Sequence, residues 1–113
     1  MHIPFIGIEG DRHWEENSLR HRIGGPALVL SHALYMVYYR KGKPHRMKGP
    51  AIIYGNGATE YFQFGKRHRV DGPALQWTDH KEYWQFGELH RIDGPAIQYI
   101  DYTEYWKYGK KIR

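Results

Sequence analysis

The sequence has no cysteine and little else that could act as a nucleophile. Because none of its 113 residues is Cys, the chain can have no disulfide scaffold, thiolate zinc site or thiol nucleophile, and it fits a reducing compartment. The only serines are Ser18 and Ser31, and each has a histidine close by in the sequence. Since the chain contains eight histidines, such neighbours are expected by chance and do not indicate a catalytic triad.

Long apolar runs and helical periodicity are also missing. The N-terminal run 3–8 contains Pro4 and Gly7, has no basic stretch before it, and is too short for a signal peptide or a membrane span. No stretch of about eleven residues shows a helical period, and proline recurs too often for a long helix. We therefore expect an all-β protein in the cytoplasm, without a membrane partner.

A repeat runs through nearly the whole chain. The dipeptide His-Arg occurs four times, and Gly-Pro-Ala follows three residues after each copy; the histidines are His21, His45, His68 and His90. They are 24, 23 and 22 residues apart. This period predicts a single domain of stacked units over residues 1–113. Its parts are an N-terminal cap with a degenerate repeat (1–17), repeats 18–41, 42–64, 65–86 and 87–108, and a truncated repeat (109–113). We align the degenerate copy 10–14 with residues 80–84, which matches Trp14 to Trp84.

Each unit is predicted to be a β-hairpin. A short apolar run follows Gly-Pro-Ala, a turn such as Gly55-Asn56-Gly57 comes next, and an aromatic second strand ends at a glycine. The expected strands are 28–30, 52–54, 75–77 and 97–100, followed by 60–64, 82–86 and 104–108 as second strands. Stacking these tandem 22–24-residue units gives an elongated, twisted antiparallel sheet. Alternation puts Trp84 and Tyr83 on opposite faces, so a homodimer through one aromatic face is a further expectation.

The pattern Tyr-Trp-x-x-Gly-x-x-His-Arg-x-Asp-Gly-Pro-Ala, over residues 83–96, resembles MORN-type hairpin repeats. More narrowly, it resembles the variant found in YwqK-like bacterial proteins and in proteins of phages and large viruses. The resemblance covers roughly residues 10–113. It implies an elongated antiparallel sheet and a scaffold or binding role without an active site. By analogy it also implies a small phage-encoded inhibitor of a host protein or nucleoprotein complex, acting in the host cytoplasm.

The recurring His-Arg dipeptide predicts a structural role rather than a metal site. Two strands per unit place equivalent histidines about 9–10 Å apart, whereas ligands of one zinc ion must lie within about 4 Å of each other. We expect each His and Arg to tie its turn to the adjacent hairpin, with partners among Asp71, Asp93, Glu60, Glu82 and Glu104. Glu60, Glu82 and Glu104 could also form a glycosidase pair, but the same glutamate in successive units is better explained as an arginine partner. We therefore predict no metal, no cofactor and no enzyme, and keep a hydrolase with an unrecognised site as a third alternative.

The charge distribution departs from the repeat in the first half of the chain. The formal net charge is +5, yet no Asp or Glu lies between Asn17 and Thr59. Gly24 and Lys48 stand where the later repeats have Asp71 and Asp93. Basic and aromatic residues gather here, which suits an acidic protein surface or, as the alternative, direct nucleic-acid binding by residues 20–48. A basic face that is only solvated also stays open. The predicted partner-binding residues are Arg20, Arg22, Tyr38, Tyr39, Arg40, Lys41, Lys43, Arg46 and Lys48.

Overall fold

The computed structural model describes residues 5–6, 11–31 and 34–113, and over those residues the chain contains twenty short strands and no helix. Ten strands form one antiparallel sheet whose neighbours follow chain order. They are β1 (Phe5–Ile6), β2 (Arg12–His13), β5 (Leu28–Leu30), β6 (Tyr35–Val37), β9 (Ile52–Ile53), β10 (Thr59–Glu60), β13 (Leu75–Gln76), β14 (His80–Glu82), β17 (Ile97–Tyr99) and β18 (Thr103–Glu104). The predicted all-β class is confirmed.

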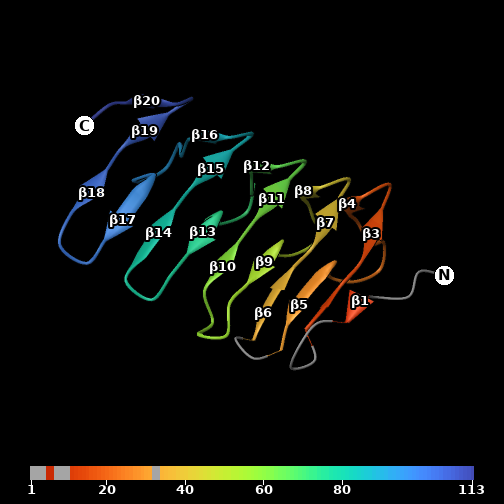
Figure 1. Cartoon of the computed structure of the whole chain (residues 1–113). Helices are drawn as coiled ribbons and strands as arrows, with labels where there is room; N and C mark the ends of the chain where they lie inside the picture. Colours follow the sequence, from red (N-terminus) through yellow and green to blue (C-terminus); the bar gives the residue numbers. More distant parts are fainter. Residues whose placement is uncertain (1–4, 7–10, 32–33) are drawn as a thin grey trace.

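The other ten strands of the described residues pair into five small hairpins. They are β3 (Glu15–Glu16) with β4 (Leu19–Arg20), β7 (Tyr39–Arg40) with β8 (Lys43–Pro44), β11 (Phe62–Gln63) with β12 (Lys66–Arg67), β15 (Trp84–Gln85) with β16 (Glu88–Leu89), and β19 (Trp106–Lys107) with β20 (Lys110–Lys111). Figure 1 shows these hairpins side by side along one side of the ten-stranded sheet. The molecule is extended, measuring 48 × 26 × 19 Å, as expected of an array in which each repeat contacts its neighbours.

The predicted second strand of each repeat is in fact interrupted. The expected strand 60–64 is divided at Tyr61 into β10 and β11, and Phe64 lies in the turn that follows. Phe64 and Gly65 have φ values of 50° and 82°, the left-handed conformations that match the twist of a two-residue hairpin turn. The chain then returns as β12, a strand that the sequence analysis missed. The glycine at the second turn position was the available signal for it.

The core is narrow and is built from small side chains and from apolar side chains of neighbouring repeats that pack on each other. The alanine of every Gly-Pro-Ala has no exposed surface; these are Ala27, Ala51, Ala74 and Ala96. One apolar cluster joins Leu28, Val37 and Ile52, and Tyr39 and Phe62 pack against it. Val37 occupies the register position that Glu60 and Glu82 hold in later repeats. Each of the three pairs with the residue that directly follows a Gly-Pro-Ala, at the start of the next strand. Valine at this position, where later repeats have glutamate, is therefore explained by its packing in the apolar cluster.

The degenerate first repeat is a real unit, but the sequence alignment placed it one residue out of register. The Trp14 N–H donates to the Ala27 carbonyl at 2.8 Å, just as the Tyr83 N–H donates to the Ala96 carbonyl at 2.8 Å. Trp14 is therefore the counterpart of Tyr83 and not of Trp84. Since a slip of one residue moves a side chain to the other face, the correction places the Trp14 ring with the repeating tyrosines.

Candidate binding surface

The four histidines of the His-Arg dipeptides form a buried column that joins successive repeats. Each is only 5–7% exposed. Its Nδ1 accepts a backbone N–H from the turn of the next hairpin, at 2.9–3.1 Å; the donors are Lys41, Phe64, Phe86 and Tyr108. This confirms the predicted tie between hairpins, and it requires Nδ1 to be unprotonated. Burial lowers the pKa of His45, helped by the nearby charge of Arg40, and burial also lowers the pKa of His68.

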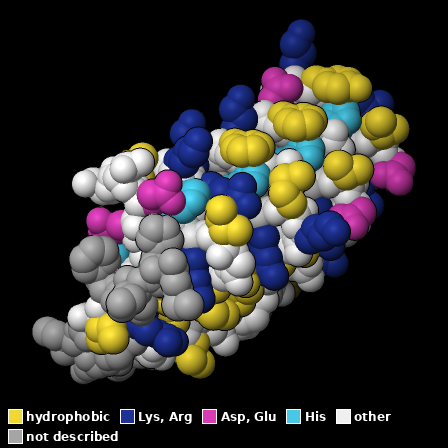
Figure 2. Space-filling view, turned by 90° about the vertical axis from the view of Figure 1, so that its right-hand side faces the viewer, with side chains coloured by type: hydrophobic (Ala, Val, Ile, Leu, Met, Phe, Trp, Pro, Cys, Tyr) yellow, Lys and Arg dark blue, Asp and Glu magenta, His cyan; other side chains and the backbone are white. Residues whose placement is uncertain are grey.

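Three of the turns place an aromatic ring over the preceding histidine. The rings of Phe64, Phe86 and Tyr108 lie 4.1–4.2 Å, centre to centre, from the imidazoles of His45, His68 and His90. These turn residues are still 63–67% exposed. Figure 2 shows hydrophobic side chains in rows along the molecule, with histidines beside them.

The arginines of the repeat are held in one common pose. Each guanidinium lies 3.9–4.1 Å from the centre of an aromatic ring in the preceding unit; the pairs are Arg22 on Trp14, Arg46 on Tyr38, Arg69 on Tyr61 and Arg91 on Tyr83. Its Nη1 also donates to the carbonyl of the proline four residues on, at 3.1–3.3 Å. This stacking covers the aromatic rings on the face of the sheet that carries the repeating tyrosines, and it fixes the plane of the guanidinium.

The glycine three residues after each arginine is required by this packing. A Cβ built on Gly25, Gly49, Gly72 or Gly94 would lie 2.8–2.9 Å from the arginine Cζ. Glycine therefore lets the guanidinium lie flat against its own loop.

The outer edge of the guanidinium is paired in the later repeats only. Arg69 Nε donates to Asp71 Oδ1 at 3.1 Å, and Arg91 Nε lies 3.4 Å from Asp93 Oδ1. The hydrogen bond from Arg69 lowers the pKa of Asp71. These pairs confirm the predicted partners Asp71 and Asp93. Within the part of the chain that the structure describes, no carboxylate pairs with Arg22 or Arg46.

A hollow opens between successive His-Arg loops, and a fourth lies between the last such loop and the C-terminal segment; each has a tyrosine and at least two arginines in its lining. We name these the Tyr38, Tyr61, Tyr83 and Tyr105 hollows, with volumes of about 400, 490, 520 and 400 Å³. The residue after each His-Arg is aliphatic and 64–75% exposed; these residues are Ile23, Met47, Val70 and Ile92. The last three stand at the rims of the hollows, and Ile23 holds the equivalent position in the first loop. Together the rims and hollows form what we call the ribbed surface.

The structure divides the nine predicted partner-binding residues between different places. Five line the Tyr38 hollow: Arg22, Tyr38, Arg40, Arg46 and Lys48. Arg20 lies instead 5.7 Å from the ring of Tyr39, which packs on the apolar cluster of the opposite face. Lys41 is in a turn with φ 49°, and the stem of Lys43 packs against the turn at Gly65. The sequence located the basic region but not this division.

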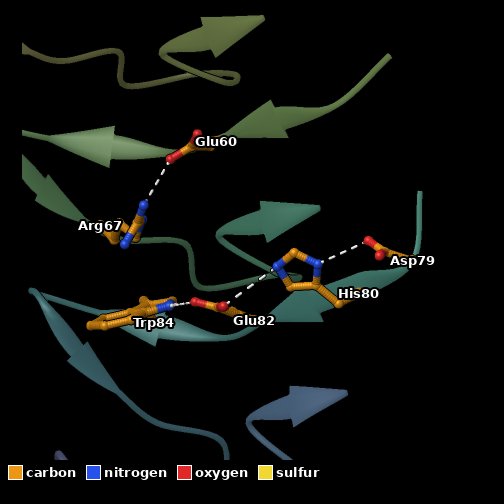
Figure 3. A network of polar contacts seen from close by, with 6 residues as sticks. All are labelled: Glu60, Arg67, Asp79, His80, Glu82 and Trp84. Carbon is orange, nitrogen blue, oxygen red and sulfur yellow. Dashed lines mark hydrogen bonds and ion pairs between the residues drawn. The ribbon is translucent and has the colours of Figure 1, made fainter. Parts of the chain in front are cut away.

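The glutamates of the second strands have other partners than the repeat arginines. Glu60 is buried, and it accepts hydrogen bonds from Arg67 at 3.0 Å and from the Tyr54 hydroxyl at 2.6 Å. Burial, then this bond to Glu60, raises the pKa of Tyr54. Glu82 accepts from Trp84 Nε1 at 2.8 Å, and lies 3.5 Å from His80, which contacts Asp79 (Figure 3). Glu104 likewise accepts from Trp106 Nε1 at 2.9 Å.

The prediction that Glu82 and Glu104 pair with arginine was therefore wrong. The alternation of the strand brings the indole two residues further on to the same face, where its N–H reaches the carboxylate first.

Across residues 5–6, 11–31 and 34–113, no group of three or more His, Asp or Glu side chains is placed to hold a metal ion. The same residues include no helix that could cross a membrane. No known protein family, curated protein or solved structure matches this chain. The resemblance to MORN-type repeats stays a prediction.

Proposed function

We propose that this chain is a non-catalytic repeat module that binds a protein partner on its ribbed surface. The observation that carries the proposal is the row of exposed aliphatic side chains, one per repeat, beside a matching row of hollows. Folded proteins seldom leave such side chains in contiguous rows unless another surface covers them. The action as a phage-encoded inhibitor rests on the resemblance alone and stays a prediction.

The lining of the hollows supports a protein partner with an acidic side. The Tyr38 hollow has four cationic side chains in its lining and no carboxylate, while the Tyr61 and Tyr83 hollows contain Asp71 and Asp93. The surface thus changes from basic to mixed along its length, but the aliphatic rims continue throughout. Apolar rims suit protein side chains, whereas phosphate contacts need cations alone. Direct nucleic-acid binding through the Tyr38 hollow is the second candidate.

We expect a double variant, Val70→Asp with Ile92→Asp, to lose the partner while keeping its fold. Both side chains are more than 70% exposed, so charging them changes stability little. Burying two unpaired carboxylates in an apolar contact is unfavourable. The measurement is capture of lysate proteins by the immobilised wild type and variant, with thermal melting to verify folding.

The matched control is Ile100→Asp, since Ile100 is 89% exposed but lies at a turn away from the hollows. We expect the control to capture the same proteins as the wild type. If the double variant captures them as well, the ribbed surface is not the docking surface and the proposal fails.

A further inference from the structure

The pose of the repeat arginine does not depend on whether an aspartate is present. Arg22 and Arg46, which have none beside them, lie 3.9 and 4.0 Å from their aromatic rings, and Arg69 and Arg91, which have one, lie 4.1 and 4.0 Å away. Their bonds to the proline carbonyls are also alike, at 3.3 Å for the first two and at 3.1 and 3.2 Å for the others. Stacking and the loop, not the aspartate, therefore set the position of Nε.

The aspartate is missing only where the Tyr38 hollow lies. Position 24 is glycine, with φ +90° and open space where a side chain would begin, and position 48 is an exposed lysine. In the next repeats the carboxylates of Asp71 and Asp93 are themselves well exposed, so the matching place beside Arg22 or Arg46 is open to solvent. Val37, the other position without an acid, has a packing role. At position 24 the φ of +90° itself favours glycine, whereas nothing in the structure explains the lysine at position 48.

We infer that Arg22 and Arg46 are a pair of carboxylate-recognition points, at which the partner supplies the acidic groups that Asp71 and Asp93 supply internally. The inference rests on the proposed protein-binding function and names its partner chemistry. The ligand is an acidic protein segment that places carboxylates at the Nε edges of these arginines, near Arg40 and Lys48. Ion pairs of this kind give orientation and specificity because the guanidinium fork is fixed beforehand.

Two observations favour a carboxylate over a phosphate. The same arginine pose already holds a carboxylate at 3.1 Å in the third repeat, so the shape of the loop fits that group. The rim beside the hollow is Met47, which is exposed and apolar and offers nothing to a phosphodiester backbone. A polypeptide can place an aliphatic side chain directly beside a carboxylate, which matches the position of Met47 next to Arg46.

The test exchanges the two kinds of repeat and uses poly-L-glutamate as the probe. Lys48→Asp supplies Arg46 with an internal carboxylate, as in the later repeats, and we expect it to weaken binding at least about tenfold. Asp71→Lys makes the third repeat like the second and frees Arg69 Nε, so we expect tighter binding. Affinities are measured by fluorescence titration at low ionic strength, and melting temperatures verify that each variant folds.

Two controls change the net charge equally, away from the hollows. Lys110→Asp is the control for Lys48→Asp, and Asp101→Lys is the control for Asp71→Lys; both positions are exposed near the C-terminal end. We expect each control to alter the affinity far less than its partner, because its charge acts only at long range.

The outcomes separate this inference from the proposed function. If both exchanges behave like their controls, the arginines are not recognition points, while the double variant Val70→Asp with Ile92→Asp still decides whether the ribbed surface docks a protein. If wild type binds oligo-dT more tightly than poly-L-glutamate and the exchanges alter that binding, the ligand is a nucleic acid and the carboxylate assignment is overturned. Binding to neither polymer also overturns the inference.

Discussion

At the scale of single residues, the His-Arg dipeptide reaches two different neighbours. The histidine accepts a backbone N–H from the hairpin that follows, and the arginine stacks on a ring of the unit before it. Each dipeptide is thus a two-way link along the array. The link depends on a neutral Nδ1, because a protonated imidazole has no acceptor there.

We expect His68→Ala to lower the free energy of unfolding by about 1–3 kcal/mol, because the Phe86 N–H loses its acceptor in a partly buried place and the imidazole leaves a gap. His68→Asn keeps an acceptor oxygen near the position of Nδ1 and should recover part of the loss. Urea unfolding of the three proteins measures this. Equal stability of the Ala variant and wild type would contradict the link.

The lowered pKa values also predict how stability depends on pH. His45 and His68 have folded-state pKa values below the unfolded value of about 6.5. The unfolded chain therefore binds more protons in the window just below that value. Stability is fully present above about pH 6.5 and is lost as the pH falls toward the folded-state pKa values. A His45→Asn/His68→Asn variant should lose less unfolding free energy than the wild type between about pH 7 and pH 5, measured by urea unfolding. If unfolding free energy depends on pH equally in both proteins, these two histidines do not cause the loss.

At the scale of elements, the unit of the fold is a sheet hairpin followed by a small second hairpin. In the third full repeat these are β13 with β14 and β15 with β16. The small hairpins are also linked to each other, since the Gly65 N–H donates to the Pro44 carbonyl and the Gly87 N–H to the Arg67 carbonyl, both at 2.9 Å. No element of this kind buries much surface alone, so neighbours stabilise one another.

Removing one whole unit should therefore be tolerated better than removing part of one. Deleting residues 68–89 joins Arg67 to His90 and restores the repeat pattern, so we expect a folded, shorter array with a moderately lower melting temperature. Deleting only residues 79–89 removes β14, β15 and β16, so β13 loses its hairpin partner β14 and keeps only β10. We expect a severe loss of cooperative unfolding, followed by circular dichroism. Equal melting temperatures of the two deletion variants would show that the pair of hairpins is not the unit of folding.

At the scale of the whole molecule, the two faces differ in how their rings are covered. Arginines stack on the tyrosines of one face, as at Tyr61 and Tyr83. On the other face, rings continue from repeat to repeat with centres 4.7–6.2 Å apart. The partly buried ones are Tyr35, Tyr54, Trp77, His80 and Tyr99, and the row ends at the exposed Tyr102. No cation covers this row within the described chain, which makes it the aromatic face through which we expect a homodimer.

We expect the wild type to self-associate as concentration rises, and Tyr99→Glu to shift it toward monomer because a charge would be buried in the contact. Sedimentation velocity over a range of concentrations measures this. Ile100→Glu is the control, one residue further and in a turn. A wild type that stays monomeric at every concentration would exclude the homodimer.

The sequence alone determined the repeat, its all-β character and the location of the basic region. These follow from features that each unit carries locally: Gly-Pro-Ala before an apolar run, a glycine after aromatic residues, and a charge imbalance in chain order. Only the tertiary structure decided which residues share a face. Arg20 lies beside Tyr39 whereas Arg22 lines the Tyr38 hollow, and Glu82 accepts from the indole of Trp84 instead of from an arginine. The placement of the arginines depends on contacts between neighbouring repeats, such as the stacking of Arg22 on Trp14, which no single repeat specifies.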